Sequence, residues 1–529
     1  MVQISNPVLP GFHPDPCIIW AQGYYFLATS TFEWWPGVQI HRSKDLGQWE
    51  LAGYALTRQS QINMRGNPDS GGVWAPALSY ADGRFWLVYS DVKCHAGPFK
   101  DVRNYLITSA HIDGPWSDPI YLNSSGFDPS LYHDADGRKW LVSQVWKTAL
   151  NRGAFAGILL QEFSKAEGRL IGEPVNIFRG TSIGLTEGPH LYHKDGYYYL
   201  VTAEGGTEWE HAVTVARSRG ITGPYEVSPD NPLLTSADNP NHSLQKAGHG
   251  SFVQSPDGNW YLAHLCSRPT GSPRRCILGR ETALQAITWP PGEWPKLAGG
   301  GREPALSIEL PVVSAKPYLT EYLDDFSATA LNLNWNTLRE PSAESWLSLT
   351  ENPGYLRLYG RCSLQSCFDQ SLVGFRVLHS SCTVATRIKF SPSSFQQRAG
   401  VAMYYNTSNF YYAYVTANDH GQRELQILAC DNRRCRDILS NPIPLPFAEA
   451  FELRVTLSLD RLQFFFVNRD GIDQPAGPEL DASILSDDYP NEGGIGLAFT
   501  GLFAGLCAQD SSDLRTPADF KWFRYNADR

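Results

Sequence analysis

Three carboxylates, Asp15, Asp128 and Glu187, lie eight or nine residues before a glycine that recurs along the first 300 residues of this 529-residue chain. Trp74 and His249 hold the same position in the two remaining copies of the pattern. Two carboxylates beside a sugar-sized pocket can hydrolyse a glycosidic bond: one protonates the leaving oxygen, and the other activates water or attacks the sugar. A third carboxylate can raise the pKa of the acid by repulsion, and the indole of Trp74 can cover the apolar face of a pyranose.

A single acidic residue at the start of a strand is most simply a solvated side chain or an acceptor for a turn N–H. Three at one position of a repeat favour a functional interpretation, because like charges cannot all ionise in a dry pocket. The sequence has no HExxH motif, and no nucleotide-type glycine-rich loop or GxSxG elbow stands where its chemistry would need it. His249 alone is ambiguous between a metal ligand, a hydrogen-bond donor and a packed imidazole.

The repeat is defined by turn glycines, Gly23, Gly83, Gly137, Gly196 and Gly258, at spacings of 60, 54, 59 and 62 residues. Each lies between a short strand and an aromatic strand, as in DGRFWLVYS (82–90), which is the pattern of a β-hairpin. Each unit is long enough for four strands, and no long helical pattern separates the units. Residues 1–300 are therefore predicted to form a five-bladed β-propeller, with the shared position at one mouth of its central channel.

The composition changes near residue 297, where a Gly- and Pro-rich stretch begins. We expect a linker over 301–319 and a second domain over 320–529. Alternating strands such as CTVATRIKF (382–390) and GGIGLAFTG (493–501) predict an antiparallel β-sandwich, so that the whole chain is all-β. Such a domain is either a carbohydrate-binding module or a packing partner.

The formal charge of −10 argues against nucleic acid as a partner, and no apolar run is long enough to span a membrane. The N-terminus lacks a basic region followed by an apolar region. We therefore expect a cytoplasmic protein, or a secreted one whose signal was removed before this numbering begins. Oligomeric state stays open, with a homo-oligomer as one option.

Ten cysteines are present, and six lie beyond residue 361. Cys362 and Cys367 share the C-x4-C spacing with Cys430 and Cys435. These pairs could form two disulfide loops or a metal cluster, although neither spacing matches the usual C-x2-C pairing of zinc sites. In a chain of this length, free buried thiols are the slightly preferred interpretation.

Several stretches, in order along the chain, resemble glycoside hydrolase family 43. They include NPVLPGFHPDPCI (6–18), SGFDPSLYHDADG (125–137), LTEGPHLYHKDGYYYL (185–200), QKAGHGSFVQ (245–254) and LGRETALQ (278–285). The likeness is greatest to the branch of β-xylosidases with a C-terminal, lectin-like sandwich domain, many of which also cleave α-L-arabinofuranosides.

The resemblance implies an inverting mechanism with Asp15 as general base, Glu187 as general acid and Asp128 as the group that tunes and orients the acid. It implies that Arg280 binds sugar hydroxyls near the base and that Phe32 and Trp74 form subsite walls. His249 matches the central-channel histidine, which in some members lies beside a bound cation.

A loop of the sandwich domain closes the pocket in this branch, and FTGLFAGLCAQD (499–510) is the matching stretch, with Phe503 at the pocket. Trp34-Trp35 could be a sugar platform or packing between blades. No cofactor is required, although a structural Ca²⁺ in the channel is one option.

A pocket closed at one end admits a chain end. The sequence therefore predicts an exo-acting enzyme that removes xylose from the non-reducing end of β-1,4-xylooligosaccharides, with α-L-arabinofuranosidase activity. The expected partner is a small xylo- or arabino-oligosaccharide. The alternatives are an arabinan-directed hydrolase on the same scaffold and a non-catalytic, sugar-binding propeller.

Overall fold

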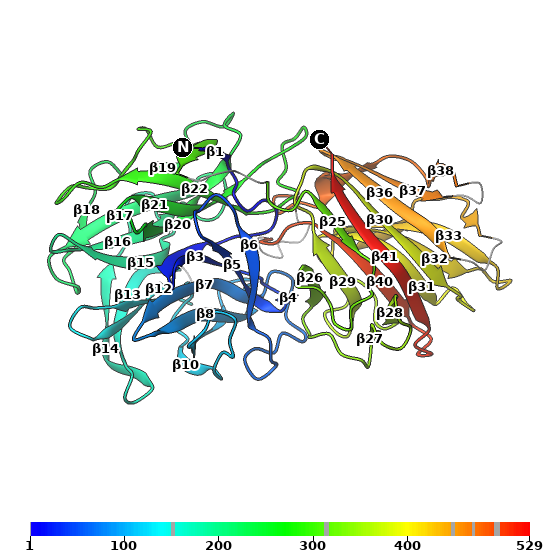
Figure 1. Ribbon diagram of the computed structural model, residues 1–529, viewed down its shortest axis with the longest axis horizontal. Helices are drawn as coiled ribbons and strands as arrows, with labels where there is room; N and C mark the ends of the chain where they lie inside the picture. Colours follow the sequence, from blue (N-terminus) through cyan, green and yellow to red (C-terminus); the bar gives the residue numbers. More distant parts are fainter. Residues whose placement is uncertain are drawn as a thin grey trace.

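The computed structural model describes residues 2–149, 154–311, 317–445, 450–467, 471–490 and 498–528. Over these residues the chain is all-β, and its one helical element is the short 3-10 turn η1 (Ala482–Ile484). Two β-rich bodies lie side by side in Figure 1, an N-terminal one in blue to green and a C-terminal one in yellow to red. None of the described helices is long and apolar enough to cross a membrane.

The N-terminal body contains five antiparallel sheets of four or five strands, each built from strands that follow one another in the chain, except that the first sheet leaves out β4. Blade 1 contains β2 (Cys17–Ala21), β3 (Tyr24–Thr29), β5 (Gly37–Ser43) and β6 (Glu50–Leu56). Blade 2 contains β7 (Gly72–Ala81), β8 (Arg84–Cys94), β9 (Asp101–Ser109) and β10 (Ile120–Asn123). Blade 3 contains β11 (Ser130–His133), β12 (Lys139–Trp146), β13 (Phe155–Ser164) and β14 (Arg169–Phe178).

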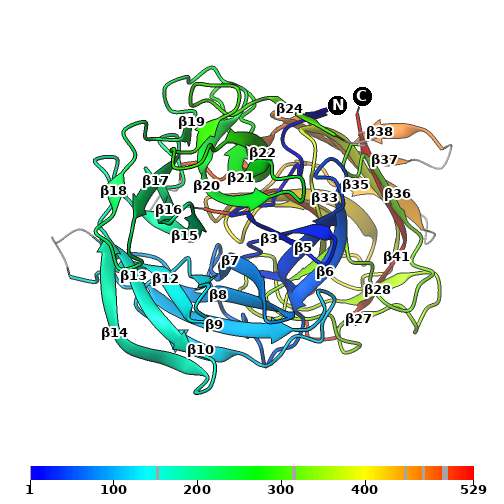
Figure 2. The same cartoon turned by 60° about the vertical axis from the view of Figure 1, so that its left-hand side comes forward.

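Blade 4 contains β15 (Glu187–Lys194), β16 (Tyr197–Glu204), β17 (Ala212–Ser218), β18 (Glu226–Val227) and β19 (Leu234–Thr235). Blade 5 contains β20 (Gln245–Gln254), β21 (Trp260–Ser267), β22 (Glu281–Thr288) and β23 (Lys296–Leu297). The first strands of the blades contact one another in a closed ring, in the order β2, β7, β11, β15, β20 and back to β2. This ring is the inner wall of a five-bladed propeller, seen in Figure 2 with the blades around a common centre.

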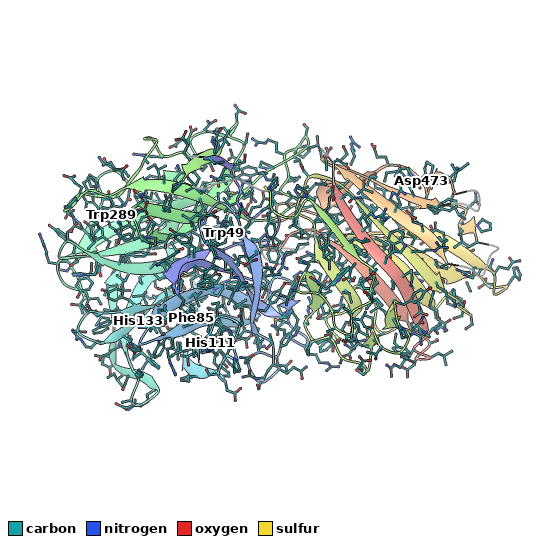
Figure 3. All side chains as sticks on the ribbon, in the orientation of Figure 1. Trp49, Phe85, His111, His133, Trp289 and Asp473 are labelled. Carbon is teal, nitrogen blue, oxygen red and sulfur yellow. The ribbon has the colours of Figure 1, made fainter. Side chains whose placement is uncertain are left out.

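The recurrent glycines lie in the predicted hairpin turns. In three blades the two turn residues both have positive φ, with Asp82 and Gly83 at 54° and 71° as one example. This conformation, the type I′ turn, matches the twist of the strands it joins, and the first residue pays little strain when it is Asp. Aromatic rings from successive hairpins pack between blades: Phe85, labelled in Figure 3, is fully buried with its ring 5.4 Å from that of Phe26 in blade 1.

The propeller is closed by its N-terminal segment. β1 (Val2–Ser5) pairs antiparallel with β24 (Ser307–Leu310), and Leu9 forms a bridge with Thr282 of β22. Residues 301–311 therefore belong to the edge of the propeller, although 301–319 was expected to be a linker; residues 312–316 of that range lie outside the described residues. The backbone N–H and C=O groups of β1 require a partner strand, and β24 supplies it.

The C-terminal body is a sandwich of two antiparallel sheets. One contains β25 (Glu321–Asp324), β27 (Leu347–Ser348), β28 (Leu356–Tyr359), β30 (Ser381–Phe390), β36 (Phe451–Ser458), β37 (Arg461–Val467), β38 (Asp473–Pro475), β39 (Leu480–Asp481) and β41 (Pro517–Ala527). The other contains β26 (Trp335–Leu338), β29 (Ser371–Arg376), β31 (Gln397–Tyr404), β32 (Phe410–Ala417), β33 (Arg423–Asp431), β34 (Arg434–Asp437), β35 (Ile443–Pro444) and β40 (Phe503–Asp510). Of the strand expected at 493–501, residues 493–497 lie outside the described residues.

The two bodies share a sheet and a core. β4 (Trp34–Trp35), which belongs to a loop of blade 1, pairs with β26 and so extends a sheet of the sandwich. Trp34 is fully buried, and its ring is stacked on that of Phe503 at a centroid distance of 3.6 Å. The Trp34-Trp35 pair is therefore packing between domains and not a sugar platform.

Replacing Trp34 by alanine should strongly destabilise the junction. Removing a fully buried Trp costs about 3–5 kcal/mol of unfolding free energy, so the apparent melting temperature measured by calorimetry should fall. As a matched control, Phe395→Ala removes a ring that is 58% exposed and should change stability by no more than about 0.5 kcal/mol. Equal melting temperatures for the two variants would contradict this account of the junction.

Candidate active site

A residue with positive φ lies just before the inner strand of each blade or within the first half of that strand. The φ values at this position are positive throughout: Asp15 54°, Ala75 34°, Asp128 52°, Gly188 57° and His249 45°. In three blades the pairing of the inner strand also shifts register here, beside Trp74, Glu187 and Gly248. Such a kink costs about 1–3 kcal/mol for a residue with a Cβ and re-aims the neighbouring side chains. It turns the side chains at the shared repeat position toward one mouth of the channel.

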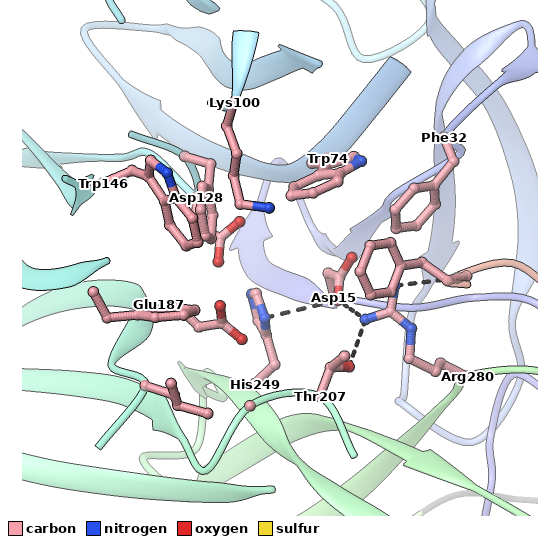
Figure 4. Close-up of a pocket in the computed structure, with 15 residues that line it drawn as sticks. Asp15, Phe32, Trp74, Lys100, Asp128, Trp146, Glu187, Thr207, His249 and Arg280 are labelled. Atoms are coloured by element: carbon pink, nitrogen blue, oxygen red, sulfur yellow. Dashed lines mark hydrogen bonds and ion pairs between the residues drawn. The ribbon is translucent and has the colours of Figure 1, made fainter. Parts of the chain in front are cut away.

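These side chains line one pocket of about 230 Å³, shown in Figure 4. Seven of the eight predicted site residues are on its wall: Asp15, Phe32, Trp74, Asp128, Glu187, His249 and Arg280. The other lining residues are Lys100, Phe127, Trp146, Phe155, Leu185, Gly206, Thr207 and Phe499. The position shared by the five repeats thus identified a real cluster.

Asp15 is held as a carboxylate. Its Oδ2 accepts a hydrogen bond of 2.6 Å from the Ser30 hydroxyl, and its Oδ1 lies 3.1 Å from Nη1 of Arg280 and 3.7 Å from Nδ1 of His249. Burial by itself would raise the pKa of Asp15, but Arg280, His249 and Ser30 together outweigh burial and hold the pKa below its ordinary value. An ionised, hydrogen-bonded carboxylate is what a general base requires.

Ring closure explains why Arg280 meets a residue 265 positions earlier in the chain. The N-terminal segment runs along blade 5, with the His13 N–H donating to the carbonyl of Arg280 at 2.9 Å. Arg280 also donates to the Thr207 hydroxyl at 2.9 Å and to the Phe499 carbonyl at 3.1 Å. Arg280 is only 5% exposed, so this cation acts in a poorly solvated setting where charge interactions are strong.

The pKa values of Asp128 and Glu187 are shifted in the opposite direction to that of Asp15. In Figure 4 these two side chains lie together on one side of the pocket, while Asp15 and Arg280 lie on the other. Burial and the charge of Glu187 raise the pKa of Asp128 well above its ordinary value. Burial and the charge of Asp15 raise the pKa of Glu187 to about 8, although Arg280 and Lys100 oppose this. The pair titrates as a unit and retains a proton at neutral pH, so it can serve as an acid.

His249 carries no positive charge at neutral pH. Burial lowers its pKa, Arg280 lowers it further, and Asp15 opposes them. Gly188 leaves room for the ring of His249, because a Cβ at position 188 would lie 3.1 Å from the imidazole. No third Asp, Glu, His or Cys ligand atom joins His249 and Asp15 in a compact group among the described residues. These side chains alone do not form a cation cage, so the cation beside His249 stays a prediction and no step below depends on it.

Cys276, Asp487 and Asp488 do form a compact group of potential metal ligands. Lys246, however, is fully buried beside it, with Nζ 3.1 Å from Asp487 and 3.6 Å from Asp488. The ammonium group already offsets part of the negative charge of these carboxylates and of Glu208, which lies 3.2 Å from it. The cluster therefore joins blade 5 to the sandwich and has no need of a metal ion.

Phe503 was predicted at the pocket, and this prediction is wrong. Phe503 is fully buried at the start of β40, stacked on Trp34 in the core between the domains. Phe499, the first residue of the same stretch, lines the pocket instead. The apolar run that follows Phe503 indicates a buried strand, whereas Phe499 precedes that strand, and this difference was the available signal.

Ser70 connects the sandwich to the pocket walls. Its hydroxyl accepts a hydrogen bond of 2.9 Å from the Phe499 N–H, and its carbonyl accepts one of 2.8 Å from the Trp74 indole. Its own N–H donates to the buried carboxyl of Glu33 at 3.0 Å. One loop residue of blade 2 thereby sets both the indole wall and the contribution of the second domain.

Lys100 and Trp146 also line the pocket, but the sequence did not predict them. The Lys100 ammonium lies 4.4 Å from the centroid of Trp146 and 5.8 Å from that of Trp74. Lys100 belongs to the loop between β8 and β9, and Trp146 ends β12. Neither residue lies at the shared position of the repeat, so periodicity gave no signal for them.

Comparison with known proteins agrees with this geometry. Residues 4–295 match the model of glycosyl hydrolases family 43, and residues 323–526 match the beta xylosidase C-terminal concanavalin A-like domain. The chain belongs to glycosyl hydrolase family 43. The resemblance and the fold class predicted from the sequence are thereby confirmed.

Full-length relatives of this family 43 enzyme are known. The chain is 47% identical to a beta-xylosidase of Bacillus subtilis (strain 168) over 99% of both chains. It is 48% identical to xylosidase/arabinosidase 43B of Humicola insolens over 99% of this chain and 98% of that one. The crystal structure of a xylan beta-1,4-xylosidase from Bacillus halodurans C-125 matches with a TM-score of 0.95 and 50% identity, over 99% of this chain and 100% of that one.

The charge of Lys100 should set the upper pH limit of this family 43 site. Glu187 must be protonated to act as an acid, so activity should be retained below its pKa of about 8 and fall as the pH rises above it. Because Lys100 favours the ionised carboxylate, Lys100→Met should raise the pKa of Glu187 and move the basic limb of kcat/KM to higher pH.

A pH profile of kcat/KM on xylobiose, whose leaving group needs the proton of the acid, measures this shift through the position of the basic limb, separately from any loss of binding. Lys165→Met is the control, because Lys165 is 57% exposed and pairs with Asp82 outside the pocket. A basic limb that stays in place or moves to lower pH in Lys100→Met would contradict the electrostatic assignment.

Proposed function

We propose that this glycoside hydrolase removes single xylose residues from the non-reducing end of β-1,4-xylooligosaccharides with inversion, and also cleaves terminal α-L-arabinofuranosides. The observation that carries the proposal is the division of one pocket into an ionised carboxylate, Asp15, and a protonated pair, Asp128 and Glu187. An inverting glycosidase needs these two states at the same pH.

The proposed reaction begins with the terminal sugar in the pocket, between the indole of Trp74 and the Arg280 guanidinium. Asp15 takes a proton from a water molecule, which attacks the anomeric carbon from the face opposite the leaving oxygen. Glu187 donates its proton to that oxygen, so the glycosidic bond breaks as the new C–O bond forms. Asp128 accepts a hydrogen bond of 3.1 Å from the Gly188 N–H, which fixes its position beside the acid, and its coupling to Glu187 lets the two carboxyl groups retain a proton together.

Exo action is supported by the closed end of the pocket. Phe499 of the sandwich domain packs against Phe32 of blade 1 with centroids 5.8 Å apart, and Arg280 lies over both rings. This packed wall opposes extension of a sugar chain past it, which favours entry of a chain end. The names of the relatives support xylose as the substrate sugar and arabinose as a second one.

The stereochemistry of xylobiose hydrolysis tests the reaction. Proton NMR during the first turnovers should show α-xylose from the non-reducing unit, because inversion converts a β-linkage into an α-product. Newly formed β-xylose in excess of the amount that the reducing unit of xylobiose contributes would contradict inversion. Release of sugar from arabino-oligosaccharides but not from xylobiose would favour an arabinan-directed hydrolase, and no release from either would favour a sugar-binding propeller.

Glu187→Gln tests the assignment of the acid. Without a proton donor, substrates with poor leaving groups should lose far more activity than activated aryl glycosides, by at least about 100-fold on the scale of general acid catalysis. Asp15→Asn is the matched comparison: it should reduce both substrate classes alike, since water activation is needed for each. Equal losses on both classes in Glu187→Gln would remove Glu187 from the acid role.

A further inference from the structure

We infer that Cys430 and Cys435 form a dithiol site that glutathione disulfide converts into an intrachain disulfide. This site lies in the sandwich domain and is independent of the proposed function. Both residues are free thiols in the structure. They are direct partners in the antiparallel register of β33 and β34.

The turn that joins these strands fixes the geometry of the pair. Asn432 and Arg433 both have positive φ, 48° and 68°, and they alone separate the paired residues Asp431 and Arg434. In such a two-residue type I′ hairpin the pair flanking the turn is the hydrogen-bonded one. Because the ladder alternates, the next pair outward, Cys430 with Cys435, is non-hydrogen-bonded, with Cα atoms about 4.5 Å apart and side chains on one face.

This geometry falls within the range that a disulfide accepts, which is about 4.4–6.8 Å between Cα atoms. The other C-x4-C pair of the chain lacks it. Cys362 bridges to Gln370, and Cys367 follows a turn that begins at Ser363, so the two cysteines are not opposite each other. Among the described strand pairings, Cys430 and Cys435 are the one cysteine pair that faces across a ladder.

The two thiols differ in access, as a nucleophile and a resolving group should. Cys435 is exposed, whereas Cys430 is fully buried. Burial, and the neighbouring Cys435, raise the pKa of the Cys430 thiol. Its sulfur donates to the Ser408 carbonyl at 3.3 Å and accepts from the Gln365 amide at 3.5 Å. Oxidation removes this donor, but the same carbonyl keeps the hydrogen bond from the Arg433 N–H at 3.0 Å.

The charge around the exposed thiol suits an anionic disulfide. Arg433, Arg434 and Arg436 are all exposed and lie within two residues of Cys435. Such a cluster attracts glutathione disulfide, which carries net negative charge. Molecules of this class can therefore reach Cys435 in preference to the buried thiols of the chain.

The chemistry proceeds by two exchanges. The Cys435 thiolate attacks one sulfur of glutathione disulfide, breaks its S–S bond and releases one glutathione thiolate. Cys430 then loses its proton and attacks the Cys435 sulfur of the mixed disulfide. The Cys430–Cys435 bond forms, the second glutathione leaves, and the two protons of the protein thiols end on the two glutathione molecules.

The test uses the full-length folded protein and glutathione disulfide, followed by denaturing alkylation, trypsin and mass spectrometry. Trypsin cuts after Arg433 and Arg434, so the disulfide should join the peptide 424–433 to the dipeptide 435–436. Two of the ten thiols should be lost to alkylation and restored by dithiothreitol.

Two variants make the result specific. Cys430→Ser should trap glutathione on Cys435, and Cys362→Ser should still form the Cys430–Cys435 bond. The inference is overturned if wild-type Cys435 remains glutathionylated while Cys430 is alkylated, if Cys435 is joined to Cys362 or Cys367, or if both thiols stay reduced.

Discussion

The contact between Arg280 and Asp15 is the interaction on which the rest of the site depends. Three carboxylates that line one pocket cannot all ionise easily, and the single guanidinium that touches one of them favours ionisation of that one. With Asp15 ionised, its charge raises the pKa of both Asp128 and Glu187. The ionised state of the proposed base and the protonated state of the proposed acid are therefore two results of one asymmetry in the pocket.

The two domains act as one catalytic unit. The propeller strand β4 pairs with a sheet of the sandwich, and Phe499 of the sandwich domain lines the pocket. Ser70 links the two domains at the pocket, since it forms hydrogen bonds with the Phe499 backbone and with the Trp74 indole through separate atoms. The carbonyl of Phe499 also accepts a hydrogen bond from Arg280, so the second domain helps to orient the cation that sets the charge states.

Periodicity alone gave the fold of the first 300 residues and five pocket residues, because a propeller converts a shared sequence position into spatial convergence. Arg280 and Phe32 lie off that position, and only the family resemblance pointed to them. Lys100 was invisible because the loop that carries it has no counterpart in the repeat. The prediction for Phe503 was wrong for a different reason. The loop that lines the pocket and the buried strand that follows it lie within five residues of each other, and the boundary between them depends on packing against Trp34.

The contact between blade 5 and the N-terminal segment, which closes the propeller, determines when the two charged groups of the site can meet. During synthesis the base is made near the start of the chain, and its cation follows 265 residues later, in the last blade. Until blade 5 folds against the N-terminal segment, Asp15 has no guanidinium partner. Carboxylates left together in an unfinished ring repel one another, which opposes premature closure of the channel mouth. The Asp15–Arg280 pair thus forms in the same event that closes the propeller, and a chain arrested before Arg280 has neither the pair nor the closed ring.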